Sequence, residues 1–143
     1  MDFKALAVEM GVSEPYDDVE GFKAAFEDIC RVVEKLPPDL LERGRNLPYP
    51  QLHWAARQGD LAMVCALLSA GVGADSYTYF EDDEDETALV WLAETDGLDT
   101  DLKIQIAQAL IAKGAYMDEA LARANDNADD RFAAYLRTQG ALD

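Results

Sequence analysis

The hydrophobic and polar positions of this chain repeat a pattern of two short helices joined by a tight turn. The pattern is clearest from Gln51 to Gly71, where small and apolar residues share one helical face until Gly59 and Asp60 interrupt it. A second apolar stripe then follows at helical spacing, formed by Met63, Val64, Leu67 and Leu68. Gly71 suits a left-handed helix end. Two such helices cannot bury both stripes alone, so the pattern predicts stacking on similar units.

The same pattern recurs twice further along the chain. A second copy opens at Thr87–Ala93 and ends at Leu110–Ala115, and a third opens at Leu121–Ala124 and ends at Tyr135–Ala141. The first and third copies have equal lengths, whereas the second has six extra residues between its helices. The recurrence predicts an all-α helical solenoid in which each unit packs on its neighbours.

Residues 1–47 are predicted to form an N-terminal helical cap on this stack. Apolar residues share one face in residues 3–10, and a longer stripe runs through residues 22–36 until two prolines end it. A short helix from Asp39 to Arg43 is expected to follow and to close at Gly44. An end unit exposes a face that a polar-backed helix can cover. In the alternative interpretation, the long helix docks a partner.

The first copy resembles the ankyrin repeat, whose signature is T-P-L-H-x-A, a glycine turn, an apolar outer helix and a terminal glycine. The resemblance is carried by Leu52, His53, Trp54, Ala55, Ala56, Gly59, Asp60, Val64, Leu67, Leu68 and Gly71. The later copies are degenerate but keep its register. The resemblance implies a short ankyrin-like solenoid of about three repeats, at 48–84, 85–117 and 118–143, which forms one domain with the cap.

One departure from the family concerns a threonine and a histidine that ankyrin repeats pair within one unit. The first copy has His53 but Pro50 at the threonine position. The second has Thr87 but Val90 at the histidine position. The internal hydrogen bond of the family is therefore in doubt in both copies.

The connection between the first and second copies is longer than the family spacing. Gly71 and Thr87 are 16 positions apart, against about 12 in the repeat pattern. This predicts an extended finger loop, in which aromatic residues stand beside an acidic run. These residues are Tyr77, Tyr79, Phe80, Glu81, Asp82, Asp83, Glu84, Asp85 and Glu86. Aromatic anchors with a charged rim are typical of interfaces, although a solvated loop that only aids solubility is the alternative.

A second candidate surface follows from the repeat register. In ankyrin proteins, the position after T-P-L-H lies on the concave, partner-facing side of the inner helix. The resemblance places Trp54, Trp91 and Arg123 there, and both tryptophans of the chain fall on this position. One turn further along lie Arg57, Glu94 and Asp126. We expect an exposed or half-exposed ladder, because Trp and Arg are enriched at binding hot spots; packing of the tryptophans in the core is the alternative.

Charge narrows the choice of partner. The chain has 12 Lys and Arg residues against 29 Asp and Glu residues, a net charge of −17. Such a chain is repelled by nucleic acid and anionic membranes and attracted to basic proteins. It shows no secretory signal and no run of about 20 apolar residues. Cys30 and Cys65 form no CxxC motif, which favours buried free thiols and a cytoplasmic location.

Motifs for catalysis or cofactor binding are missing from the sequence. The one histidine, His53, occupies a structural position of the family, and no Ser-His-Asp set, P-loop, GxGxxG or zinc spacing occurs. The acidic stretches at 81–86 and 96–101 lack the residue order of an EF-hand. We therefore expect no enzymatic activity, no cofactor and no dedicated metal site.

The sequence thus predicts a non-enzymatic module that binds a basic protein partner through its concave face and acidic finger. The most concrete version is an inhibitor or immunity protein that neutralises a toxin or effector, because the chain is small and strongly acidic. One alternative is a general ankyrin adaptor or scaffold. Another is a self-associating structural subunit, in which a second copy covers Trp54 and Trp91.

Overall fold

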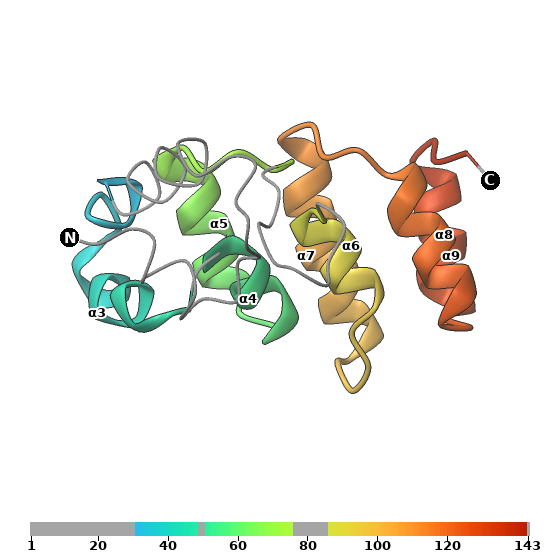
Figure 1. The fold of residues 1–143 in the computed structure, drawn as a ribbon, viewed down its shortest axis with the longest axis horizontal. Helices are drawn as coiled ribbons and strands as arrows, with labels where there is room; N and C mark the ends of the chain where they lie inside the picture. Colours follow the sequence, from blue (N-terminus) through green and yellow to red (C-terminus); the bar gives the residue numbers. More distant parts are fainter. Residues whose placement is uncertain (1–30, 49–50, 76–85, 143) are drawn as a thin grey trace, which may run out of the picture.

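The computed structural model describes residues 31–48, 51–75 and 86–142, and their regular structure is helical. The helices form pairs arranged in a line, with α3 at one end and the α8–α9 pair at the other (Figure 1). Their bounds are α3 Pro38–Asn46, α4 Gln51–Arg57, α5 Leu61–Ala70, α6 Ala88–Ala93, α7 Thr100–Ala112, α8 Asp118–Asp126 and α9 Asp130–Thr138.

The helices after α3 are arranged in two rows. Helices α4, α6 and α8 contact one another in chain order and form the front row, while α5, α7 and α9 do the same and form the back row. Each front-row helix also packs on the back-row helix that follows it. This arrangement confirms the predicted all-α helical solenoid (Figure 1).

Short sequence signals begin and end the back-row helices. Each helix starts after an aspartate whose carboxylate accepts a hydrogen bond from the backbone N–H three residues on, which satisfies one of the donors left over at a helix start. These aspartates are Asp60, Asp99 and Asp129. Helix α5 ends at Gly71, which has the predicted left-handed conformation with φ 117°.

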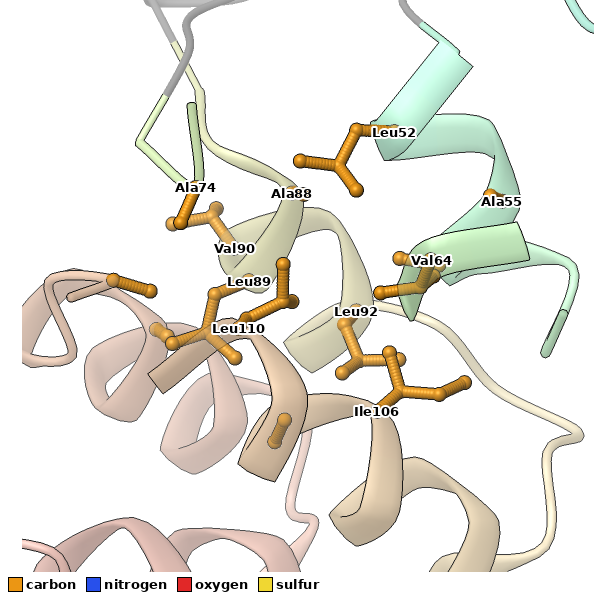
Figure 2. Close-up of a cluster of buried hydrophobic side chains, with 14 of the residues drawn as sticks. Leu52, Ala55, Val64, Ala74, Ala88, Leu89, Val90, Leu92, Ile106 and Leu110 are labelled. Atoms are coloured by element: carbon orange, nitrogen blue, oxygen red, sulfur yellow. The ribbon is translucent and has the colours of Figure 1, made fainter. Parts of the chain in front are cut away.

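The hydrophobic core runs between successive helix pairs. Leucine, valine and isoleucine side chains from α4 and α5 point toward those from α6 and α7 (Figure 2). The largest of these are almost fully buried: Leu52, Val64, Leu89, Leu92, Ile106 and Leu110. Neither pair could bury this surface alone, which is why the pattern must recur.

The described part of the predicted cap joins the same core. Val32, Val33 and Leu36 are buried in one cluster with side chains of the first repeat. Helix α3 does not close at Gly44, as the sequence suggested, but continues to Asn46. Gly44 is buried, and a Cβ atom there would lie 2.3 Å from Leu36 Cδ1, so the glycine serves close packing. The rest of the cap, residues 1–30, lies outside the described residues.

A buried lysine links the second and third repeats. The Lys103 side chain in α7 is 3% exposed, and its Nζ lies 2.7 Å from Asp129 Oδ2. The ammonium also donates to the backbone oxygens of Thr95 at 3.0 Å and Ala93 at 3.4 Å, and it lies over the Phe132 ring. Its three donors are therefore all directed at acceptors, which a buried ammonium requires.

Cys65 was expected to be buried, but it is an exposed free thiol on α5, because Val64 and Leu68 take the inward face of that helix. Cys30 lies outside the described residues. Across residues 31–48, 51–75 and 86–142, no helix is long and apolar enough to cross a membrane.

Candidate functional site

The front row brings together the predicted site residues that the structure describes. Helix α4 carries Trp54 and Arg57, α6 carries Trp91 and is followed by Glu94, and α8 carries Arg123. Glu86 precedes α6. The contacts described below connect all six. The other candidates, Tyr77, Tyr79, Phe80, Glu81, Asp82, Asp83, Glu84 and Asp85, lie outside the described residues.

A cluster of two tryptophans and one arginine joins α4 to α6. The Trp54 and Trp91 rings meet edge to face, with centroids 5.4 Å apart and planes at 84°. The Arg57 guanidinium lies over both rings, with its Cζ 4.7 Å from the Trp91 centroid and 5.6 Å from that of Trp54. These are distances at which a cation is attracted to an aromatic ring. We call these three residues the tryptophan–arginine cluster.

The three side chains of the tryptophan–arginine cluster differ in their exposure to solvent. Trp54 is half-buried and Arg57 is exposed, but Trp91 is 5% exposed. The expectation that Trp91 is exposed or half-exposed is therefore wrong. The reason is local crowding: the Arg57 guanidinium and the Trp54 ring lie against the Trp91 ring, and His53 meets it edge-on at 5.2 Å.

His53 connects the first repeat to the second. It is fully buried, and its Nε2 lies 2.7 Å from the backbone oxygen of Glu86. Because a carbonyl oxygen only accepts, Nε2 carries the proton in this contact. Thr87, the threonine of the second copy, instead begins α6 by accepting a hydrogen bond from Val90 N. The histidine thus bridges between repeats, and the threonine caps a helix.

Arg123 holds three carboxylates at the end of the front row. Its Nη1 lies 2.9 Å from Glu86 Oε1 and also bonds Glu94, and its Nε lies 3.0 Å from Glu119. Burial lowers the pKa of the guanidinium, but the hydrogen bond and charge of Glu94, with the contributions of Glu86 and Glu119, outweigh it and raise that pKa above its usual value. Arg123 therefore stays charged and ties α8 to both ends of α6.

These contacts correct the prediction for Glu86 and add carboxylate partners to the half-exposed Arg123. Glu86 was assigned to the exposed acidic run, but it is 8% exposed because it bonds Arg123 and its backbone meets His53. Arg123 is half-buried under its three carboxylates and does not stand free on the surface. Glu119 was missed, although its position four residues before Arg123 in a helix is a recognised pairing signal.

The chemistry available at this surface is that of recognition. It offers an exposed guanidinium, a half-buried indole and carboxylates held by an arginine. Within the described ranges, no three His, Cys, Asp or Glu side chains lie close enough together to hold a metal ion.

Comparison with known proteins addresses the repeat itself. No curated protein and no solved structure matches the chain. The family model of the ankyrin repeat matches residues 52–77, which span α4, α5 and the start of the connection that follows. The match confirms the resemblance of the first copy, which holds Trp54, whereas Trp91 lies outside the matched residues. Residues 52–77 are therefore similar to the ankyrin repeat, a unit that is typical of protein-binding modules.

Proposed function

We propose that this protein is a non-enzymatic binding module that holds a basic protein partner against the exposed side of its front row. The observation that carries the proposal is the placement of Trp54 and Arg57 on α4 and of Glu94 directly after α6, the next front-row helix of an ankyrin-type stack. Trp and Arg are the residue types that most often dominate binding energy. Trp91 and Arg123 have a structural role in this proposal. The Trp91 ring is buried, and the Arg123 guanidinium is paired with carboxylates.

The sign of the partner's charge follows from the charge of the chain. At −17, the protein attracts a basic surface over a distance of about a Debye length, roughly 8–10 Å at ordinary salt. Such attraction raises the rate of association more than it lowers the rate of dissociation. The acidic run Glu81–Asp85 supplies much of that attraction in this proposal, whereas Glu86 serves the packing of α6 onto α8.

The most concrete form of this function is neutralisation of a basic toxin or effector in the cytoplasm. A small, strongly acidic domain suits a dedicated inhibitor of this kind. A general adaptor would use the same surface for an unrelated target. A self-associating subunit would cover Trp54 and Trp91 with a second copy, and its assembly would not weaken at high salt, because screening reduces the repulsion between two acidic copies.

Neutralisation of the acidic run tests the steering role of the finger. The partner is first captured from cell extract at low salt with the full chain, identified and purified. Changing Asp83→Asn, Glu84→Gln and Asp85→Asn together should slow its association several-fold at low salt and little at high salt, because screening removes the attraction. Stopped-flow or surface-binding kinetics at two salt concentrations measure the effect.

The matched control removes the same charge elsewhere. Asp39→Asn, Glu42→Gln and Asp130→Asn change exposed acids on α3 and α9. This control should leave the association rate closer to that of the unchanged protein. Equal rates for the two triple variants would show that the finger has no special role in attracting the partner.

A further inference from the structure

Among the residues that the structure describes, only aromatic rings hold the Arg57 guanidinium. Most arginines in the described ranges bond a carboxylate, as Arg43 does with Asp60 and Arg131 with Asp101. Across those same ranges, the Arg57 guanidinium makes no ion pair and no hydrogen bond, although the chain has 29 acidic residues. Its contacts are the faces of Trp54 and Trp91.

The neighbouring contacts explain why no carboxylate within residues 31–48, 51–75 and 86–142 pairs with Arg57. Helix α4 contains no acidic residue. In the second repeat, the position equivalent to Arg57 is Glu94. The Glu94 carboxylate bonds Arg123 of α8. The Glu94 carboxylate is therefore paired with Arg123, and the Arg57 guanidinium contacts the two tryptophan rings.

The contacts of Arg57 leave part of its hydrogen-bonding capacity available. A guanidinium has five N–H donors that lie in its plane. Because the two rings are at 84° to each other, the guanidinium can lie flat on at most one of them, and donors that do not face the other ring remain available. Arg57 is also exposed, so a group from outside can reach them.

We propose that Arg57 is a pre-organised docking site for a carboxylate of the protein partner. An Asp or Glu side chain, or a C-terminal carboxylate, forms a bidentate pair with the guanidinium, and the half-buried Trp54 ring flanks it. This inference rests on the proposed function, since it places the contact on the front-row surface. It adds that the partner, although basic overall, presents an acidic group at this point.

The arrangement favours a carboxylate for two physical reasons. An arginine that is already immobilised loses less side-chain freedom on binding than a mobile one, which raises affinity. A bidentate pair also requires the planar fork of arginine, which lysine cannot supply. The Arg57→Lys variant should therefore lose affinity for the carboxylate, as the Arg57→Ala variant does.

Peptide selection tests the proposal without knowledge of the natural partner. A library of random 12-residue peptides is displayed on phage and selected in parallel on the full chain and on the Arg57→Ala variant. Peptides enriched on the unchanged protein should share an Asp or Glu, or a free C-terminal carboxylate, at one position. Their binding is followed by tryptophan fluorescence, because both tryptophans of the chain lie at this site.

The expected result is a loss of affinity that depends on both groups. Arg57→Ala, Arg57→Lys and the amide form of the peptide's acid should each weaken binding roughly 10- to 100-fold. Combining Arg57→Ala with the amide peptide should add little more, since the pair is already lost. Arg131→Ala, which removes the same charge from an exposed pair on the back row, should leave binding unchanged.

The other outcomes separate this inference from the proposed function. Peptides that need Trp54 but bind Arg57→Ala equally well overturn the carboxylate site and leave the front-row surface standing. Tighter binding by Arg57→Ala also overturns the carboxylate site. That result would mean that a cationic side chain of the peptide takes the place of the Arg57 guanidinium over the tryptophan rings. Peptides indifferent to both Trp54→Ala and Arg57→Ala, or the absence of any enriched peptide, contradict the site and the front-row function together.

Discussion

The Asp129→Ala variant is expected to lose about 3–5 kcal/mol of unfolding free energy, because it leaves a buried ammonium without its counter-charge. The Lys103 side chain is 3% exposed, and Asp129 Oδ2 lies 2.7 Å from its Nζ. Part of the loss comes from the start of α9, where Asp129 Oδ1 also accepts from Phe132 N. Urea denaturation followed by circular dichroism measures the change.

Two further variants separate the charge from the helix cap. Asp99→Ala removes the corresponding cap of α7 from an exposed aspartate and should cost about 1 kcal/mol. Adding Lys103→Met to Asp129→Ala removes the unpaired charge and should recover a large part of the loss. If Asp129→Ala is no worse than Asp99→Ala, or Lys103→Met recovers nothing, the buried pair does not have the role assigned to it.

The Trp91→Ala variant is expected to lose about 3–5 kcal/mol of unfolding free energy, the usual result of emptying a large buried site. Trp91 is 5% exposed, and its ring contacts His53, Trp54 and Arg57. Its removal opens a cavity between the first and second repeats. Denaturation monitored by circular dichroism gives the loss directly.

Trp54→Ala provides the comparison, because Trp54 occupies the equivalent position but is half-buried. It should cost only about 1 kcal/mol, in proportion to the smaller area that it removes from water. A Trp91→Ala protein as stable as Trp54→Ala would contradict the assignment of Trp91 to the core. That result would favour the sequence prediction, in which Trp91 is exposed or half-exposed.

The periodicity of the sequence was enough to predict the architecture. Apolar stripes, the Gly59–Asp60 break and the closing Gly71 predicted α4 and α5, and the repeat register correctly placed Trp54 and Trp91 at equivalent positions of adjacent helices. These features are local, since each depends on residues within one or two helical turns. The helical stripe of α7 could also have identified Lys103, which shares a face with Ile106, Ala107 and Leu110.

The contacts between repeats could not be predicted in the same way. Glu86 was assigned to a solvated acidic run, yet its partner Arg123 is 37 positions away. The burial of Trp91 depends on the Arg57 side chain from another helix, 34 positions earlier. A pattern of residue types contains no information about which charged group reaches which ring. Only the packing of α4, α6 and α8 determines these pairings.

The most direct test of the front-row function uses the indole N–H signals of the protein in a nitrogen–proton NMR spectrum. The chain has two tryptophans, both in the tryptophan–arginine cluster, and Trp54→Phe assigns their signals. Addition of the purified partner should shift or broaden the Trp54 indole signal at a stoichiometric ratio. If the partner binds stoichiometrically and both indole signals stay unchanged, it binds elsewhere, and the front row is not the binding surface.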